Sequence, residues 1–226
     1  MRICVSVGAA TIRNLAVKAE DALKYTDLIE LRLDWLTPPI ELSEVLDLIE
    51  RLERRGEVVV TIRRKGEGGR NSFSNEERSR ILLESASIAS YVDLEIFFGN
   101  GMRRLVNEIK SKKARVILSY HDFSSTPGLD KLRKIVAYAS DLGGDIAKVI
   151  TYANEPRDNL ACLQLVSESK IPVISFCMGR FGILSRVLCP LMGSPFTYAS
   201  LPGEPLAPGQ LSIEGVRKLW KLLKLK

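Results

Sequence analysis

Residues 27–36 read DLIELRLDWL, and from position 30 onward charged and apolar side chains alternate. The charged set is Glu30, Arg32 and Asp34. Successive side chains of a strand point to opposite faces, so these three share one face and the apolar residues between them share the other. In a parallel barrel helices cover the outer face, which places the apolar set outside and the charges inside. Buried charges are costly unless they are paired or used, so the stretch predicts a barrel with a functional interior.

Short apolar, β-branched runs like this one recur at fairly even spacing along the 226 residues. We expect strands over 3–8, 27–36, 58–63, 91–96, 114–120, 145–151, 172–177 and 197–201. Segments of helical period lie between them, and we expect helices over 41–55, 74–90, 102–113, 129–143, 154–170 and 212–226. Strand and helix alternating eight times predicts an α/β fold of the (β/α)8 TIM-barrel type. The length leaves room for a single catalytic domain, residues 1–226.

The composition is typical of a globular protein with one sizeable core, since 46% of the residues are hydrophobic and 27% are charged. No apolar run reaches the roughly 18 residues that cross a bilayer. The opening stretch 1–14, MRICVSVGAATIRN, lacks the basic, apolar and small-residue succession of a secretory signal. We therefore expect a cytoplasmic protein that has no membrane partner.

The cysteines and the single histidine bear on metal binding and on redox state. The four cysteines, which show no CxxC spacing, are Cys4, Cys162, Cys177 and Cys189. Because the chain has only one histidine, a Cys/His zinc site is not expected. We expect reduced, mostly buried thiols, no metal and no cofactor.

The formal net charge of +6 raises the question of nucleic-acid binding. Most of this charge lies in 51–55, 110–115 and 217–226, where lysine and arginine share helical segments with leucine and isoleucine. This pattern is typical of amphipathic helices with solvated basic faces. The interleaved aromatics of a single-strand binder are missing, and such a function would leave the inward charges unexplained. No nucleic-acid partner is expected.

Three further strands each carry one ionisable residue on the face predicted to point inward: Arg63, His121 and Lys148. Arg63 and His121 also fall at or just beyond the C-terminal ends of their strands, where barrels of this class place their chemistry. Together with Glu30 they are expected to converge on one pocket. The alternative is an inert ion-pair network that fills the barrel. His121 is the only histidine, and imidazole, with an ordinary pKa of about 6.5, exchanges protons near neutrality.

Lys148 indicates the type of chemistry. The stretch 145–150, DIAKVI, is otherwise a buried strand, and a lysine that loses solvation there is favoured as the free, nucleophilic amine. This predicts a Schiff base with a carbonyl substrate. His121 lies on the preceding strand, about 4.8 Å away, so its imidazole could reach a carbon next to the imine. The alternative is a lysine whose amine reaches solvent, but the apolar neighbours on both sides argue against it.

A series of motifs along nearly the whole chain resembles the type I 3-dehydroquinate dehydratase family of the shikimate pathway. They are IELRLDWL (29–36), TIRRKGEGG (61–69), ILSYHDF (117–123), DIAKVI (145–150), GILSR (182–186) and APGQ (207–210). The resemblance implies a lyase that converts 3-dehydroquinate to 3-dehydroshikimate by syn elimination of water through a Schiff base. It also implies a homodimer, and it gives neither a metal nor a cofactor a role.

The same resemblance implies roles for individual residues. Lys148 would form the imine, His121 would act as general base and then general acid, and Glu67 would pair with the histidine and raise the pKa of its imidazole. Residues implied to bind the substrate are Glu30, Arg32, Arg63, Arg186 and Gln210. The residue types fit the chemistry, because a protonated imine takes up developing negative charge and a planar guanidinium suits a carboxylate. Arg186 is expected on a loop after the seventh strand.

Three positions depart from the family pattern, which commonly has serine, methionine and phenylalanine where this chain has Leu206, Phe176 and Tyr198. Leu206 cannot supply the hydroxyl of the usual serine, and we expect the packing around the substrate to differ. Two loops rich in glycine or proline, 64–73 and 202–210, are expected either to close on substrate or to be plain connectors.

The second candidate enzyme is a class I aldolase, which would use the same barrel and lysine to cleave a carbon–carbon bond of a phosphosugar. Such a site should show a glycine-rich phosphate cradle after the seventh and eighth strands. The stretches available there are GRFG (179–182) and LPGEP (201–205), and Arg186 suits a carboxylate as well as a phosphate. A cradle would favour the aldolase, and a carboxylate site would favour the dehydratase.

Overall fold

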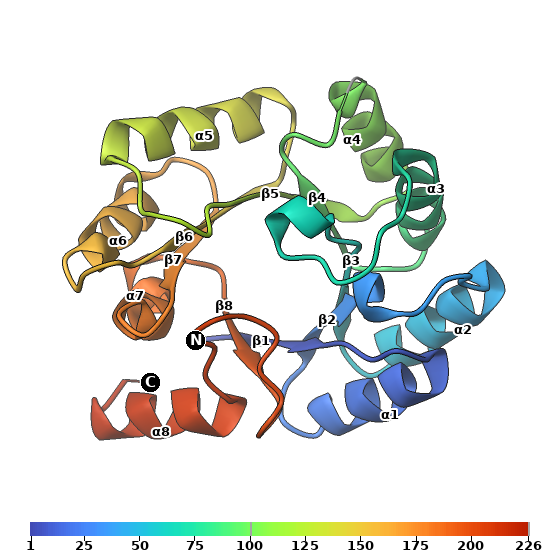
Figure 1. The fold of residues 1–226 in the computed structure, drawn as a ribbon, viewed down its shortest axis with the longest axis horizontal. Helices are drawn as coiled ribbons and strands as arrows, with labels where there is room; N and C mark the ends of the chain where they lie inside the picture. The colour runs from blue at the N-terminus through green and yellow to red at the C-terminus, as the bar shows by residue number, and fades with distance from the viewer. Residues whose placement is uncertain (100, 226) are drawn as a thin grey trace.

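The strands form one parallel sheet at the centre of the molecule (Figure 1). The structure is a computed structural model, and it describes residues 1–99 and 101–225. The strands are β1 (Ile3–Val7), β2 (Leu28–Arg32), β3 (Glu57–Thr61), β4 (Tyr91–Glu95), β5 (Arg115–His121), β6 (Ile146–Tyr152), β7 (Val173–Met178) and β8 (Thr197–Ser200). Their order is β7–β6–β5–β4–β3–β2–β1–β8, so β8 returns to pair with β1.

Helices surround the sheet on its outer side (Figure 1). They are α1 (Ile12–Ala22), α2 (Leu42–Glu53), α3 (Asn75–Ser85), α4 (Met102–Ser111), α5 (Leu129–Asp141), α6 (Asp158–Glu168), α7 (Ile183–Leu188) and α8 (Ile213–Leu222). Short 3-10 helices are η1 (Leu33–Trp35), η2 (Lys65–Glu67) and η3 (Cys189–Met192). In the described part of the chain, eight parallel strands and eight helices form a nearly closed, single-domain barrel, which confirms the predicted fold class.

Strand β6 shows how alternation sorts the side chains. Lys148 and Ile150 line the interior cavity, while Ala147 and Val149 are buried on the opposite face. Burying an aliphatic side chain of this size contributes about 1.5–3 kcal/mol, so the outer apolar row holds the helices against the sheet. The inward-facing residues are not needed for this packing, so they can be charged, as Lys148 is.

The stretch 27–36 forms a shorter strand than predicted. Strand β2 ends at Arg32 and the chain then turns into η1, so Asp34 leaves the inward-facing row. The Asp34 carboxylate instead accepts hydrogen bonds from the backbone N–H groups of Arg63 and Arg70, each at 3.2 Å, and pairs with Arg32. A buried carboxylate needs such donors, and these fasten the loop after β3 to the end of β2.

Two helices, α1 and α7, were not among those predicted. Helix α7 has six residues, which is less than two helical turns and too short to show a periodic pattern. Helix α3 begins as its sequence indicates, with a capping box between Ser74 and Glu77. Asn100 and Lys226 lie outside the described residues, so the final position of the helix expected over 212–226 cannot be compared.

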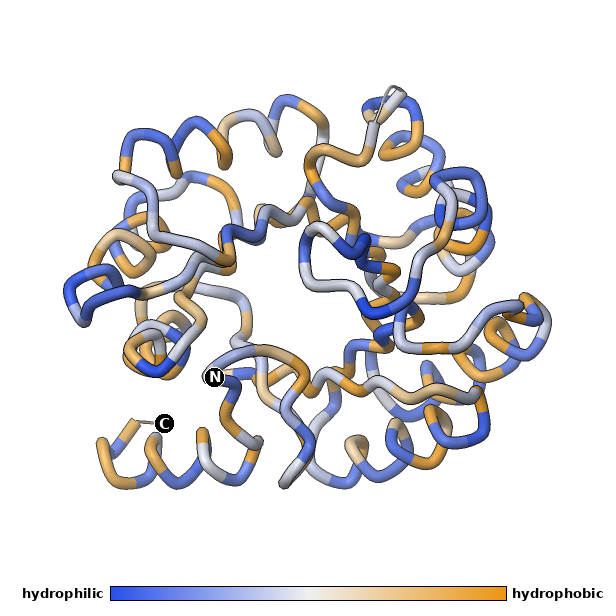
Figure 2. The backbone as a smooth tube through the Cα atoms, viewed as in Figure 1, coloured by the Kyte–Doolittle hydropathy of each residue, from blue (hydrophilic) through white to orange (hydrophobic). Residues whose placement is uncertain are grey.

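Apolar and polar residues alternate along the surrounding helices (Figure 2), as expected for helices with one face against a barrel. All four cysteines are free and buried, which confirms the prediction of buried thiols. A helix long and apolar enough to cross a membrane is not found among the described residues.

Candidate active site

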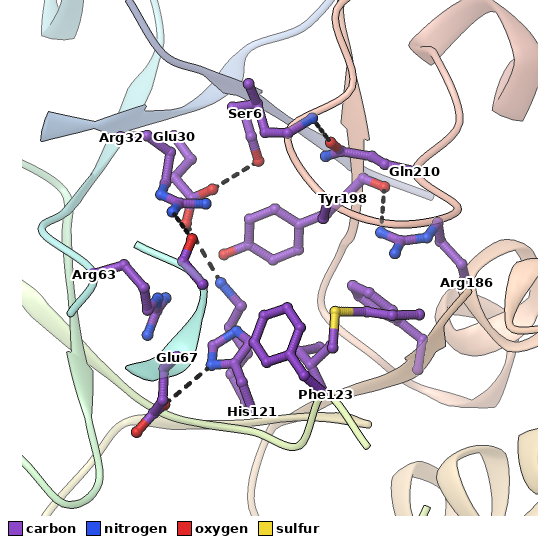
Figure 3. A pocket seen from close by; sticks show the side chains of 17 residues that line it. Ser6, Glu30, Arg32, Arg63, Glu67, His121, Phe123, Arg186, Tyr198 and Gln210 are labelled. Carbon is purple, nitrogen blue, oxygen red and sulfur yellow. Dashed lines mark hydrogen bonds and ion pairs between the residues drawn. The ribbon is translucent and has the colours of Figure 1, made fainter. Parts of the chain in front are cut away.

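A cavity at the C-terminal ends of the strands brings together the side chains singled out in the sequence (Figure 3). Its lining includes Glu30, Arg32, Arg63, Glu67, His121, Lys148, Arg186 and Gln210. They come from β2, the segment after β3, β5, β6, α7 and the loop after β8. Segments that are distant in the sequence therefore meet at one mouth of the barrel, as this fold requires.

Lys148 lies on the floor of this cavity and is 4% exposed. Its Nζ is 2.9 Å from Asp93 Oδ2 and 3.4 Å from Glu30 Oε1. It also lies 4.0 Å from the centroid of the Tyr198 ring. The amine is thus held between two carboxylates and an aromatic ring.

The sequence analysis missed Asp93, a buried carboxylate of β4 that contacts both Arg63 and Lys148. Its Oδ1 accepts hydrogen bonds from Arg63 Nη2 at 2.9 Å and from Ser119 Oγ at 2.7 Å. Burial alone would raise the pKa of the Asp93 carboxyl, but the charges of Arg63 and Lys148 outweigh it and hold that pKa well below its usual value. The signal was present, because Asp93 alternates with Val92 and Leu94 as Glu30 does with its neighbours.

Glu30 is tied to its neighbours by hydroxyl groups. Ser6 Oγ donates to its Oε2 at 2.6 Å, and Thr61 Oγ1 donates to its Oε1 at 2.9 Å. Burial would raise the pKa of the Glu30 carboxyl, yet the nearby charges of Lys148 and Arg32 lower it. Glu30 is thus a fixed carboxylate acceptor on the floor of the cavity.

Arg32 and Arg63 both have carboxylate partners. Arg32 makes a two-pronged pair with Asp34, at 2.8 Å for both of its nitrogen–oxygen contacts. The carboxylates around Arg63, first among them Asp93, raise its pKa against the opposing effect of burial. These guanidinium groups are permanently charged and held in place before any ligand arrives.

His121 is at the last position of β5 and faces Glu67 of η2, with 3.4 Å between its Nδ1 and Glu67 Oε2. Burial, together with the charges of Arg63 and Lys148, lowers the pKa of the imidazole well below its usual value. The expected raising effect of Glu67 does not set the net pKa, because one carboxylate at this distance does not offset burial and two nearby cations. Burial also raises the pKa of the Glu67 carboxyl, whose Oε1 accepts a hydrogen bond from Arg64 at 2.6 Å.

Arg186 is on helix α7 and not on a loop, which corrects the sequence prediction. Its Nη1 lies 3.5 Å from the backbone oxygen of Tyr198, and its guanidinium stacks 4.2 Å from the centroid of the Phe176 ring. Among the described residues its Nε and Nη2 have no hydrogen-bond partner. Burial lowers the pKa of this guanidinium to about 10. An anion with two oxygens is the ligand that such a group lacks.

The three positions that depart from the family pattern all line the cavity: Phe176, Tyr198 and Leu206. Tyr198 crosses the middle of it, with Arg63 on one side and Arg186 on the other (Figure 3). Gln210 Oε1 accepts a hydrogen bond from the backbone N–H of Leu206 at 2.7 Å, which shapes the loop after β8. Two aromatic rings and a leucine thus add apolar surface to the lining of the cavity.

The described residues do not supply a set of side chains that would bind a metal ion. In the parts of the chain that the structure describes, no group of three or more histidine, cysteine, aspartate or glutamate residues could hold a metal ion. The charges of the cavity are instead supplied by lysine, arginine and carboxylate side chains.

Comparison with known proteins assigns this architecture. Residues 3–226 match the family model described as type I 3-dehydroquinase. This chain belongs to the type I 3-dehydroquinase family. A 3-dehydroquinate dehydratase of Methanocaldococcus jannaschii is 35% identical over 227 residues, which cover 99% of this chain and 100% of that protein. One of Thermococcus onnurineus is 38% identical over 216 residues, covering 94% and 95%.

Solved structures agree with this assignment. The crystal structure of 3-dehydroquinate dehydratase from Geobacillus kaustophilus superposes with a TM-score of 0.90 and 28% identity, covering 99% of this chain and 91% of that one. The resemblance inferred from the motifs is confirmed, and with it the prediction of a lyase of this family. The aldolase alternative loses its basis, because the match extends over the whole barrel.

Proposed function

We propose that this protein is a 3-dehydroquinate dehydratase that removes water from 3-dehydroquinate through a Schiff base on Lys148. The reaction yields 3-dehydroshikimate and is a step of the shikimate pathway to aromatic amino acids. One observation carries the proposal: a buried lysine amine, a histidine and a guanidinium without a carboxylate partner line the same cavity. These groups suit a substrate that has both a ketone and a carboxylate.

Lys148 begins the reaction as its free amine, its ammonium proton having been released to solvent through the mouth of the cavity. The amine adds to the ketone and water leaves, which forms the imine. Protonated, this imine draws electron density from the neighbouring carbon and weakens its C–H bond. Asp93 and Glu30, whose oxygens lie 2.9 and 3.4 Å from the Lys148 Nζ, keep a negative charge beside the iminium.

His121 performs the proton transfers. An imidazole acts as a base only in its neutral form, and the lowered pKa of His121 favours that form at pH 7. His121 removes the proton next to the imine, the electrons enter the iminium to give an enamine, and the imidazolium then protonates the departing hydroxyl. Water leaves from the same face from which the proton came, which makes the elimination syn. Hydrolysis of the new imine releases the product and restores Lys148.

Binding of the substrate divides between the two sides of the cavity. Arg186 receives the carboxylate through its unpaired nitrogens. The hydroxyls face the fixed polar groups of the other side and of the loop after β8, namely Glu30, Arg32, Arg63 and Gln210. Glu67 orients the imidazole of His121.

We also propose that the whole chain, 1–226, is the catalytic domain and that it works as a homodimer in the cytoplasm. The full-length family match supports the first point, and the family resemblance supports the dimer. The four free cysteines suit a reducing compartment.

Trapping the imine tests the proposal. Borohydride added with 3-dehydroquinate should reduce the imine to a stable amine on Lys148, detected by mass spectrometry, and abolish the appearance of enone absorbance. Lys148→Met should neither react nor turn over. Lys131→Met, which alters an exposed lysine of α5, should behave as the wild type. An adduct on another lysine, or full activity in Lys148→Met, would exclude the Schiff base.

A further inference from the structure

Two cysteines outside the cavity lie in contact. Cys162 of α6 and Cys177 of β7 are both fully buried, and their Sγ atoms are 3.5 Å apart. A disulfide has an S–S bond of about 2.05 Å, so closure requires an approach of roughly 1.5 Å. Phe176 and Met178 line the cavity, so Cys177 between them faces outward to α6. The pair is therefore separate from the proposed substrate site.

Hydroxyl groups surround the two sulfur atoms. Thr151 Oγ1 is 3.3 Å from Cys162 Sγ and 3.4 Å from Cys177 Sγ, and Thr126 Oγ1 is 3.6 Å from Cys177 Sγ. Hydroxyls can donate to a thiolate, which is the reactive form of cysteine. The hydrogen bond from Cys162 lowers the pKa of Cys177 to about 6, and the same hydrogen bond raises the pKa of Cys162 well above its usual value, so Cys177 is the first of the two to react. Cys189 provides the contrast, since burial raises its pKa to about 12.

The pair is also linked to the segment that carries Arg186. The backbone N–H of Cys177 donates to Ser185 Oγ at 2.9 Å, and Ser185 Oγ donates to Asn159 Oδ1 of α6 at 2.6 Å. Ser185 immediately precedes Arg186 on α7. These hydrogen bonds already hold α6, β7 and α7 together where the sulfur atoms meet. A covalent bond between the sulfurs, once they have approached by roughly 1.5 Å, would add to this connection.

We propose that Cys162 and Cys177 form a reversible disulfide that ties α6 to β7. A low-molecular-weight disulfide such as oxidised glutathione is the oxidant. The Cys177 thiolate attacks it and releases one glutathione thiolate, and the Cys162 thiolate then attacks Cys177 Sγ and releases the second. The protein thus loses two protons and two electrons, and the oxidant becomes two thiols. Intracellular disulfides in ordinary cells are mostly transient and redox-sensing, which suits a reversible bond.

Because both thiols are buried, the test has to bring them to equilibrium independently of access. The reduced full-length protein is unfolded in urea and refolded in buffers of stepped reduced-to-oxidised glutathione ratio. It is then quenched in acid, denatured and alkylated with N-ethylmaleimide. Under oxidising ratios we expect two of the four cysteines to escape alkylation, and peptide mapping to find Cys162 joined to Cys177. Dithiothreitol should restore all four.

Matched variants identify the pair. Cys162→Ser should leave its three remaining cysteines without any protein disulfide, whereas Cys189→Ser should retain the bond. If Cys162 and Cys177 both remain alkylated at every ratio, carry glutathione only, or pair with other cysteines, the proposal is overturned.

Melting temperature gives the second measurement. The oxidised protein should melt at a higher temperature than the same protein reduced by dithiothreitol, because the bond closes a loop of the chain. Cys162→Ser should show no such difference between the two buffers. A bond that lowers the melting temperature would mean that the pair closes only by distorting the fold, and this too would overturn the proposal.

Discussion

The two sides of the cavity differ in whether their buried cations have carboxylate partners. On the side built by β2 to β6, each cation has carboxylate partners: Arg63 lies 2.9 Å from Asp93, and Lys148 contacts both Asp93 and Glu30. On the side built by α7 and β8, Arg186 is as deeply buried, but its nearest polar contact is the Tyr198 backbone oxygen at 3.5 Å. Figure 3 shows Arg63 and Arg186 on either side of the Tyr198 ring.

This difference separates groups that hold the site together from a group that awaits a ligand. Removing one partner of a buried ion pair leaves an uncompensated charge, so the paired side is fixed in the folded protein. A buried guanidinium without a carboxylate lowers stability and retains its donors for an anion. The paired side is thus suited to catalysis and the unpaired side to carboxylate binding.

The largest effect is expected from Asp93→Asn, which breaks the paired side. Loss of this charge should lower the free energy of unfolding by about 3–5 kcal/mol, because Lys148 and Arg63 lose a buried partner. Urea unfolding measures it. Glu108→Gln, which removes the exposed pair with Arg104, is the control and should change stability by no more than about 1 kcal/mol.

The dependence of this effect on pH identifies its cause. The folded-state pKa of Asp93 is lowered, so its stabilisation is present above the unfolded pKa of about 3.9 and is lost as the pH falls through the folded value. The difference between wild type and Asp93→Asn should therefore shrink below about pH 4. A difference that stays constant down to acid unfolding would show that Asp93 does not act through its charge.

Arg186→Met tests the unpaired side, and activity and stability should respond differently. The substrate carboxylate loses its charge partner, so the transition state should be less stable by about 2–5 kcal/mol. This corresponds to a kcat/KM that is roughly 30- to 5,000-fold lower. The free energy of unfolding should be unchanged or higher, because a buried charge without a carboxylate partner has been removed. Steady-state kinetics and urea unfolding measure the two. If Arg186→Met were destabilised as much as Asp93→Asn, Arg186 would have a stabilising partner in the folded protein, and the two sides of the cavity would not differ in this respect.

Glu67→Gln should produce a smaller change, mainly in the pH profile. A carboxylate beside an imidazole favours the imidazolium, so its removal should lower the pKa of His121 further. His121 acts first as a neutral base, and the acidic limb of kcat/KM against pH should consequently move to lower pH. Turnover should fall by less than about 10²-fold, since Glu67 transfers no proton itself. An acidic limb that stays at the same pH would show that Glu67 does not affect the pKa of His121.

The sequence predicted the side chains that local alternation places and missed what depends on distant neighbours. Alternation sufficed for Glu30 and Lys148, and the same rule applied to β4 would have found Asp93. The pKa of His121 could not be predicted, because it depends on burial and on cations from β6 and from the segment after β3. The helix that carries Arg186 has six residues and gives no periodic signal.

Tyr198 joins the two sides, and Tyr198→Phe should have the smallest effect. Its ring faces the Lys148 amine, its backbone oxygen accepts from Arg186, and its buried hydroxyl has no hydrogen-bond partner among the described residues. Removing that hydroxyl while keeping the ring should raise the free energy of unfolding by about 1 kcal/mol, because an unpaired buried polar group is costly. Tyr120→Phe is the control: its hydroxyl donates to Asp122 at 3.3 Å, so its loss should lower stability. Urea unfolding compares the two. If Tyr198→Phe is instead destabilised like the control, the Tyr198 hydroxyl has a hydrogen-bond partner in the folded protein, and the middle of the cavity is more polar than its contacts indicate.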